Sequence, residues 1–440
     1  MSADPAARAW LGVLAALVLS LLPSGSPLAA DGSSAGLEAC RLAARGRWIL
    51  DRAGDPTPPR GITRGLQPSG LAFRGGELWS IGDQRSAYPG HIFRIDPRTA
   101  RLLSDPVRIE AREEDAERDQ EIRAYRAIPN SDFEALCVDP KDPAILFAVT
   151  EDKIPWIAEI RVEAAPAPEA KLSAAIRRLV RIPFPEDLES WRGDPNFRFE
   201  GAAVSDDGEA LYLAFERARD GFPRIYRLRA DSLRGEGSPS LEEIRVPFGL
   251  VPRREDKPEA LLNVNDIQFV RADGRDLLLA VLRDQERLLA IDIERCEILR
   301  VVDLDLLDPS GRAIEWVSPE GLAADAASDR LWLVNDPDSM QSNYRLRSAP
   351  LADGPFAEFT PLLFEFALSD VLPVAGRQRP RKRLAATARA ARAARHAQQA
   401  PGGAVWARSG FSSSRIAPAT RSASSRTPAG SRPAAVNVTT

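Results

Sequence analysis

The sequence predicts an all-β protein folded as a single β-propeller, with five blades favoured and six as the alternative. Five segments share one pattern, in which a polar or acidic residue opens a short apolar strand, a turn follows, and a second strand ends on an acid or an amide. We call the opening residues the anchors, and they lie 65, 66, 66 and 54 residues apart at Ser69, Glu134, Glu200, Asp266 and Glu320. A repeat of this length made of short strands is typical of a propeller rather than of a helical solenoid.

Each repeat continues beyond its first two strands, which gives the three or four strands of a blade. Third strands with apolar and polar alternation are predicted at residues 91–96, 156–162, 224–230, 288–294 and 344–351. Fourth strands are predicted at 177–184 and 241–248. Residues 47–51 and 361–366 are expected to share a blade and close the ring. The charged stretch 108–126 is expected to be a solvated loop, with a short exposed helix or a mobile flap as the alternatives.

Three regions are predicted along the chain. Residues 1–30 have the features of a secretory signal peptide, with Arg8, an apolar run from Ala9 to Leu22, and small residues before the mature chain, although a retained membrane anchor is the alternative. Residues 40–375 form the propeller, and residues 376–440 form a basic tail rich in Ala, Arg, Ser and Pro that has too few aliphatic residues to fold. We therefore expect an exported monomer, periplasmic or extracellular, with no membrane span after signal removal.

Export would permit one disulfide among the three cysteines. Cys137 lies within an apolar strand pattern and is expected to be a buried thiol, so the expected pair is Cys40 with Cys296.

The charge of the chain is unevenly distributed. The formal net charge is −4, but no acidic residue follows Asp370, and the stretch from Arg377 to Arg432 holds 13 Lys and Arg residues. Residues 1–370 therefore carry 46 basic and 63 acidic groups, a net charge of −17. An acidic folded part argues against nucleic acid as a partner and suits cations.

The strand order brings the polar residues of all repeats to one end of the central channel, which we call the mouth. The first strand of a blade starts at the anchor, and the antiparallel second strand returns to the same end. Many carboxylates would then share one funnel, and closely spaced like charges either raise their pKa values or recruit a cation. Oxygen ligands suit Ca²⁺ best, and the expected metal ligands are Glu134, Glu200, Glu216, Asp266 and Glu320. The alternative is structural, with strand-end acids capping turns or pairing with adjacent bases.

Other chemistries find less support in the sequence. The chain has only His91 and His396, which disfavours a zinc site, and it contains no G-x-S-x-G elbow, P-loop or H-E-x-x-H motif. No catalytic residue is predicted.

Three of the repeats resemble a known group of proteins. The motifs are S-G-L-A-F with L-W-S-I-G-D in residues 69–83, E-G-A-A-V-S-D-D-G with L-Y-L-A-F-E in 200–216, and E-G-L-A-A-D with L-W-L-V-N-D in 320–336. They resemble the secreted bacterial propellers called phytase-like ("esterase-like activity of phytase") and SdiA-regulated proteins, over roughly residues 60–350. The phrasing is also similar to the five-bladed calcium-activated nucleotidases, which bind a central Ca²⁺. Carried over by position, the resemblance touches Glu134, Glu200, Glu216 and Glu320.

Two function classes follow. The first is a Ca²⁺-dependent phosphate-ester hydrolase, in which the phosphate oxygens would be held by Arg85, Lys153, Arg217 and Arg283. The second is a non-catalytic exported propeller that binds a small-molecule ligand or a protein partner at the mouth, because a fold alone does not fix an activity.

Overall fold

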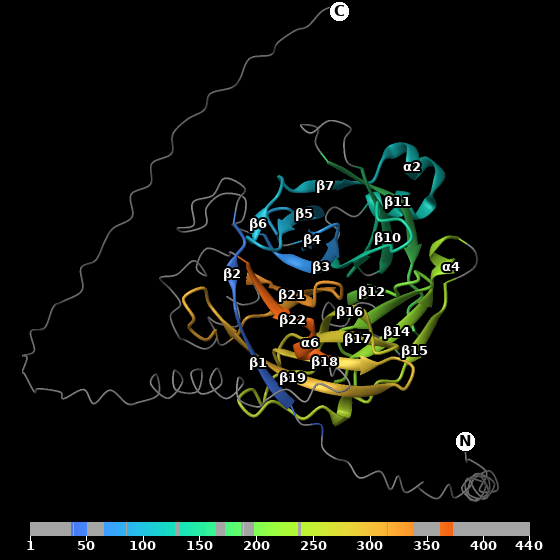
Figure 1. Cartoon of the computed structure of the whole chain (residues 1–440). Coiled ribbons are helices and arrows are strands. Elements are labelled where there is room, and N and C mark those ends of the chain that lie inside the picture. Colours follow the sequence, from blue (N-terminus) through green and yellow to red (C-terminus); the bar gives the residue numbers. More distant parts are fainter. Residues whose placement is uncertain are drawn as a thin grey trace, which may run out of the picture. The chain divides into compact units, whose positions relative to one another are not determined.

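The computed structural model describes residues 37, 39–50, 66–84, 86–127, 132–152, 154–163, 172–185, 188, 198–235, 239–314, 316–337 and 361–372. This part of the chain is mostly β-strand, and its strands follow the predicted repeats (Figure 1). The segments expected to be a signal peptide and a basic tail, 1–30 and 376–440, lie outside the described residues. Among the helices that the structure describes, none has both the length and the apolar character needed to cross a bilayer.

Each repeat contributes three or more strands, which pair antiparallel with their neighbours in the repeat. The first repeat holds β3 (Pro68–Arg74), β4 (Glu77–Gly82), β5 (His91–Asp96), β6 (Arg101–Leu102) and β7 (Val107–Glu110). The second holds β8 (Phe133–Val138), β9 (Ile145–Thr150), β10 (Trp156–Glu163) and β11 (Ser173–Arg181). The third holds β12 (Phe199–Val204), β13 (Ala210–Phe215), β14 (Arg224–Arg229) and β15 (Leu241–Ile244). The fourth holds β16 (Val264–Ala272), β17 (Arg275–Leu282), β18 (Arg287–Asp292) and β19 (Glu297–Leu307). The fifth holds β20 (Pro319–Asp325), β21 (Arg330–Asn335) and β22 (Leu362–Ala367).

The first strands of the repeats form a closed series at the centre. β3 contacts β8, β8 contacts β12, β12 contacts β16, β16 contacts β20, and β20 contacts β3 again. Glycine permits this close approach, because a Cβ atom on Gly70 would lie 2.3 Å from the backbone nitrogen of Leu136. The arrangement is that of a propeller, in which the innermost strands surround an axis.

The predicted closure by the two ends of the domain is confirmed. β2 (Arg47–Trp48) pairs antiparallel with β22 in the sheet of the fifth repeat. The third strand of that repeat was predicted at 344–351, which lies outside the described residues, but β22 is the strand that pairs with β21.

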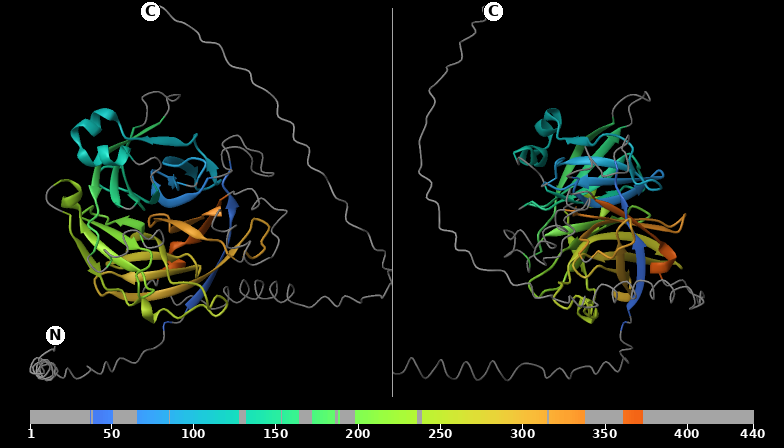
Figure 2. Two further views of the ribbon diagram at one scale, coloured as in Figure 1. Left: turned by 180° about the vertical axis from the view of Figure 1, so that it is seen from behind. Right: turned by 90° about the vertical axis from the view of Figure 1, so that its left-hand side faces the viewer.

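One strand was not predicted. β1 (Ala39–Arg45) pairs in parallel with β19, so it adds a fifth strand to the sheet of the fourth repeat. Figure 2 shows the blue β1 beside the yellow strands of that repeat in two further views.

The favoured prediction of a solvated loop at 108–126 is wrong, and the alternative of a short helix agrees better with the structure. Its start belongs to β7, which pairs with both β5 and β11 and so joins the first two repeats in one sheet. Two short helices follow, α2 (Glu113–Arg118) and α3 (Gln120–Arg126). Asp119 caps α3 by accepting the backbone N–H of Glu121 at 2.8 Å, and Ile122 on the same helix is fully buried. Burial of that apolar face stabilises the helical conformation of the segment.

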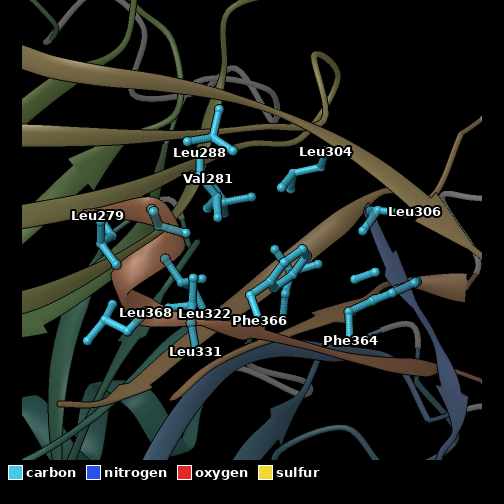
Figure 3. Close-up of a cluster of buried hydrophobic side chains, with 14 of the residues drawn as sticks. Leu279, Val281, Leu288, Leu304, Leu306, Leu322, Leu331, Phe364, Phe366 and Leu368 are labelled. Atoms are coloured by element: carbon cyan, nitrogen blue, oxygen red, sulfur yellow. The ribbon is translucent and has the colours of Figure 1, made fainter. Parts of the chain in front are cut away.

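Large apolar side chains fill the space between the sheets of neighbouring repeats. Figure 3 shows one such cluster, in which Leu279 and Val281 of the fourth repeat lie with Leu331 and Phe364 of the fifth, all fully buried. Truncation of a side chain of this kind to alanine removes about 2 to 5 kcal/mol of stability.

The expected disulfide is wrong, because all three cysteines are free and all three are described. Cys40 lies opposite Val302 in the pairing of β1 with β19, and its Sγ accepts a hydrogen bond from Arg300 Nε at 3.2 Å. Cys296 lies in the turn that precedes β19. The expectation that Cys137 is a buried thiol is confirmed, and burial raises its pKa.

Candidate functional site

A β-bulge lies at the start of every first strand. The pairing of first and second strands shifts register between Phe133 and Ala135, between Phe199 and Gly201, and at the corresponding places in the other repeats. A bulge adds one residue to a strand and redirects its side chain. Each bulge contains one of the following residues, which we call the bulge ring, and the bulge of the first repeat contains Gly70 as well: Ser69, Glu134, Glu200, Asn265 and Glu320.

The bulge ring corrects one predicted anchor. In the fourth repeat the bulged residue is Asn265, and Asp266 takes the place that Ala135, Gly201 and Gly321 hold elsewhere. The predicted role of Asp266 as an anchor at the same phase as the glutamates is therefore wrong. The apolar strand could have shown this, since it begins two residues after the anchor in every repeat, with Ile267 in the fourth.

Asp266 is instead surrounded by backbone amides of the inner strands. Its carboxylate accepts the N–H of Ile267 at 2.8 Å and the N–H of Leu322 at 2.7 Å, and the amides of Ala202 and Leu71 also donate to it. The donors come from the first, third, fourth and fifth repeats. Burial raises the pKa of Asp266, while these four hydrogen bonds favour its ionised form.

Arg283 connects three repeats on one side of the mouth. Its Nη1 lies 2.8 Å from Glu320 Oε1, its Nη2 lies 2.9 Å from Glu216 Oε1, and its Nε lies 3.5 Å from Asp284 Oδ1. Asn263 Nδ2 donates to the same oxygen of Glu216 at 3.0 Å. We call these five residues the arginine clamp. Two predicted metal ligands, Glu216 and Glu320, are thus already paired with a cation.

The other side of the mouth holds a cluster of carboxylates. Asp83, Asp132 and Glu134 each offer one oxygen, and the three oxygens lie within 4.8 Å of one another. We call these residues the acidic triad. Asp83 follows β4, and Asp132 and Glu134 flank the start of β8, so the triad spans the first two repeats. Asp132 also accepts the backbone N–H and the side-chain amide of Gln84.

Mutual repulsion and burial act on the acids around the triad. Burial raises the pKa of Glu134, and the nearby carboxylates of Glu200 and Asp132 raise it further. Burial and Asp132 raise the pKa of Glu151 to about 9, against the opposing charge of Arg198. Burial raises the pKa of Asp152 to about 6. Such shifts are typical of a site that holds protons until a cation replaces them.

The structure brings together four of the five predicted metal ligands at the mouth, in two groups. Glu134 belongs to the triad. Glu200 faces both groups, because burial, Glu151 and Glu216 raise its pKa while Arg283 of the clamp lowers it. Glu216 and Glu320 lie in the arginine clamp.

Of the predicted phosphate ligands, Arg85 and Lys153 lie outside the described residues. Arg217 is half-buried after β13, and Arg283 forms the clamp. Sequence reasoning missed Arg198, which donates through Nη1 to the carbonyl of Glu151, and it missed the two asparagines Asn263 and Asn265.

The oxygen atoms around the triad are suitable ligands for a hard cation. Carboxylate and amide oxygens are the ligands that Ca²⁺ prefers. Asn265 Nδ2 donates to Glu200 Oε2 at 3.3 Å, while Asn265 Oδ1 is buried with no hydrogen-bond partner. Because Asn265 is only 1% exposed, that oxygen is a buried acceptor which a cation could satisfy.

Comparison with known proteins finds similar structures but does not assign the chain to a family. No family model and no curated protein matches the chain. Among solved structures, glutaminyl cyclase from Myxococcus xanthus is 14% identical, with 74% of this chain and 97% of that chain covered and a TM-score of 0.40. The calcium-binding protein regucalcin from Agrobacterium tumefaciens is 11% identical, with 75% and 95% covered and a TM-score of 0.36. A β-propeller domain from Myceliophteria thermophila is 9% identical, with 68% and 83% covered and a TM-score of 0.31. These scores carry no functional argument, so the propeller architecture rests on the repeats and on the closed series of inner strands described above.

Proposed function

We propose that the chain is an exported five-bladed β-propeller that binds a hard divalent cation, Ca²⁺ by preference, at the side of the mouth formed by the first two repeats. The observation that carries the proposal is the acidic triad, whose three ligand oxygens lie within 4.8 Å of one another. Glu200 and Asn265 of the bulge ring would add oxygen ligands from the third and fourth repeats. The closed contacts of β3, β8, β12, β16 and β20 support the count of five blades.

The chemistry of the donors favours Ca²⁺ over softer metals. All candidate ligand atoms are oxygens, and the described histidine, His91, has its Nδ1 2.9 Å from the carbonyl of Pro89 instead. Neighbouring carboxylates that repel one another gain most from a doubly charged ion.

We further propose that the cation serves to bind a phosphate ester, in the manner of the phytase-like and SdiA-regulated propellers that the repeats resemble. A bound cation would screen the phosphate charge and activate water for hydrolysis. Arg217, and Arg85 and Lys153 beyond the described residues, would hold the phosphate oxygens.

A non-catalytic ligand-binding propeller is the second candidate, and one observation favours it. Arg283, the best-placed base, is engaged by Glu216 and Glu320 at 2.9 and 2.8 Å, so a phosphate would compete with two carboxylates for it. Both candidates retain an exported monomer that binds no nucleic acid.

The cation is tested by thermal unfolding of the full chain with and without millimolar Ca²⁺. A ligand that binds only the folded state stabilises it by about 2.7 kcal/mol at a hundredfold excess over its dissociation constant. We expect Ca²⁺ to raise the melting temperature of the wild type, and Glu134→Gln to reduce that rise because it removes one triad charge while keeping the side-chain shape.

Glu163→Gln is the matched control, since Glu163 ends β10 and its side chain is 56% exposed. It should respond to Ca²⁺ like the wild type. An identical response of Glu134→Gln and the wild type would rule out a cation site at the acidic triad. Release of phosphate from a panel of phosphate esters, measured with and without chelator, then separates the hydrolase from the ligand-binding propeller.

A further inference from the structure

We propose that the guanidinium of Arg283 takes the place of a second metal ion in the mouth. The mouth then binds one metal ion only, at the acidic triad. The proposal deepens the cation site proposed above and rests on it only for the first ion.

The geometry shows what Arg283 replaces. Glu216 and Glu320 come from the third and fifth repeats, and each side chain is only 7% exposed. The guanidinium between them contacts both, at 2.9 and 2.8 Å, and a third carboxylate, that of Asp284, lies 3.5 Å from its Nε. Without this positive charge, two buried carboxylates would face each other, and the neutral amide of Asn263, which donates to Glu216 at 3.0 Å, would not offset their repulsion.

The surrounding groups would also suit a metal ion. Asn263 lies against the clamp, and its Oδ1 accepts the backbone N–H of Asp284 at 3.3 Å. The clamp therefore offers three carboxylates and an amide, which are oxygen ligands of the kind a hard cation takes. Arginine fills the position permanently, because its guanidinium stays charged and its fork bridges two carboxylates at once.

The two sides of the mouth differ for this reason. On the clamp side the cation is part of the chain. On the triad side, Asp83, Asp132 and Glu134 each place one carboxylate oxygen within 4.8 Å of the other two, while the nearby Arg198 is directed to Glu151, with its Nε 3.9 Å from Glu151 Oε1. An ion from solution is therefore drawn to the triad. A phosphate ester bound at the mouth would contact one metal ion and one guanidinium. The mechanism with two adjacent metal ions, which many phosphatases use, would then be excluded.

The test counts bound ions on the full chain, with Tb³⁺ as a luminescent substitute for Ca²⁺ and with Ca²⁺ in equilibrium dialysis. The wild type is expected to bind one ion in the mouth. Arg283→Ala should bind one ion more, because the freed carboxylates of Glu216 and Glu320 recruit it. Adding Glu216→Gln and Glu320→Gln to Arg283→Ala should remove the additional ion.

Two controls isolate the position of the charge. Arg283→Lys keeps a positive charge in the clamp and should bind as many ions as the wild type. Arg271→Ala makes the same change of net charge at an exposed pair, where Arg271 Nε lies 2.7 Å from Asp276 Oδ1, and it should also bind as many ions as the wild type.

The outcomes separate this inference from the proposed function. If the wild type binds no ion and Arg283→Ala binds one, the triad site fails and the role of Arg283 stands. If both bind the same number, the role of Arg283 is overturned, whatever that number is. A gain by Arg283→Lys or Arg271→Ala would also overturn it. Should Arg283→Ala not fold, Arg283→Gln, a shorter polar side chain without the charge, replaces it in the same comparison.

Discussion

Asp266 joins the inner strands of the propeller through one carboxylate. Its oxygens accept backbone amides of Leu71, Ala202, Ile267 and Leu322, which stand two residues after the bulge in their repeats. Backbone amides that point toward a narrow axis need an acceptor, because water has little room there and an unpaired buried N–H is costly. Asp266 is 1% exposed and supplies this acceptor from within the chain.

The first prediction is that Asp266→Asn lowers the free energy of unfolding by about 2 to 4 kcal/mol. The substitution keeps the shape of the side chain but replaces one acceptor oxygen with a donor NH₂ group, which then faces backbone N–H groups. Urea denaturation measures the loss. Asp276→Asn, at a half-buried position of β17 where Asp276 pairs with Arg271, is the control and should cost less than about 1 kcal/mol. An Asp266→Asn protein as stable as the control would show that the amides find other acceptors.

The second prediction concerns protons on the acids around the triad, chiefly Glu151. An acid whose pKa is raised in the folded state keeps its proton when the unfolded chain has lost it, so folding stability falls as the pH rises from 4.5 to about 9, the two pKa values for Glu151. Acids with lowered pKa values, such as Asp207 and Asp308, oppose this trend only near and below their ordinary value of 3.8.

The measurement is the melting temperature from pH 5 to 9, without and with Ca²⁺. It should fall with rising pH in chelator and fall less in Ca²⁺, since the ion replaces the protons. Calorimetry in buffers of different ionisation enthalpy should then detect proton release on Ca²⁺ binding. Parallel pH profiles with and without Ca²⁺ would mean that these carboxylates do not bind the ion.

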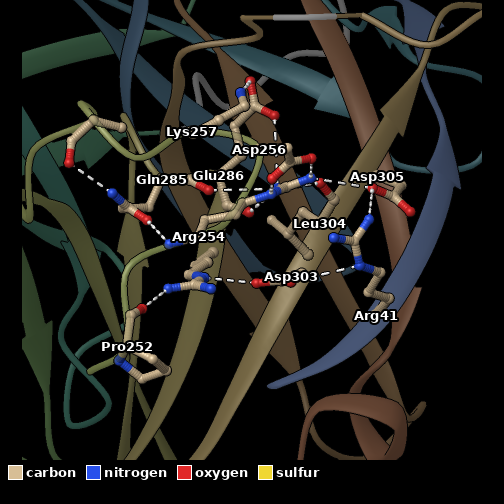
Figure 4. Close-up of polar contacts among 12 residues, drawn as sticks. Arg41, Pro252, Arg254, Asp256, Lys257, Gln285, Glu286, Asp303, Leu304 and Asp305 are labelled. Atoms are coloured by element: carbon tan, nitrogen blue, oxygen red, sulfur yellow. Dashed lines mark hydrogen bonds and ion pairs between the residues drawn. The ribbon is translucent and has the colours of Figure 1, made fainter. Parts of the chain in front are cut away.

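At the scale of single elements, a network of buried charges fixes the segment 252–262 to the sheet of the fourth repeat (Figure 4). Arg254 is 1% exposed, and its Nη2 lies 3.2 Å from Asp305 Oδ1 while its Nη1 donates to the carbonyl of Leu304 at 2.9 Å. Lys257 Nζ lies 2.7 Å from Glu286 Oε1 and 4.4 Å from the ring centre of Trp316. Each buried charge in this network has a partner, so the network is expected to stabilise the fold rather than to bind a ligand.

The third prediction is that Arg254→Met lowers the free energy of unfolding by about 3 to 5 kcal/mol. Methionine fills much of the space, but it leaves the carboxylates of Asp305 and Glu286 buried with less compensating charge. Denaturant unfolding measures the loss, and hydrogen exchange should show faster exchange in 252–262. Arg271→Ala, which breaks an exposed pair, should cost no more than about 1 kcal/mol. A similar small cost for Arg254→Met would show that the network contributes little to stability.

Strands and helices could be predicted from the sequence where the residues that determine them lie close together in the chain. Second strands such as β13 and third strands such as β14 were predicted because alternation and turns mark them within a few residues. A helix at α3 was only an alternative prediction because its charged residues outnumber the buried Ile122. The bulge at Asn265 was missed because a one-residue shift of register depends on the neighbouring strand, which sequence alone does not place. The clamp was missed for the same reason, since Arg283, Glu216 and Glu320 come from three repeats.

At the scale of the whole molecule, the N-terminal segment joins two repeats. β1 adds to the sheet of the fourth repeat and β2, one residue later, adds to that of the fifth. Arg41 on β1 lies 3.6 Å from Asp303 and 3.7 Å from Asp305, which ties β1 to β19. The closing strand of a propeller resists opening of the ring because it pairs chain ends that are distant in sequence.

The fourth prediction is a graded response to N-terminal truncation. A chain lacking residues 1–38 keeps both strands and should unfold like the mature protein. A chain lacking 1–46 loses β1 and exposes the edge of β19, so its melting temperature should fall. A chain lacking 1–49 also loses β2, which leaves β22 at the edge of the fifth-repeat sheet without its partner strand, so it should melt lowest and over a broader range. Deletion of the basic residues 378–440 provides the comparison, because their composition offers nothing to pack, and it should shift the melting temperature by less than about 5 °C. A chain lacking 1–49 that melts as sharply and as high as the chain lacking 1–38 would show that the ring is held closed by the inner strands alone.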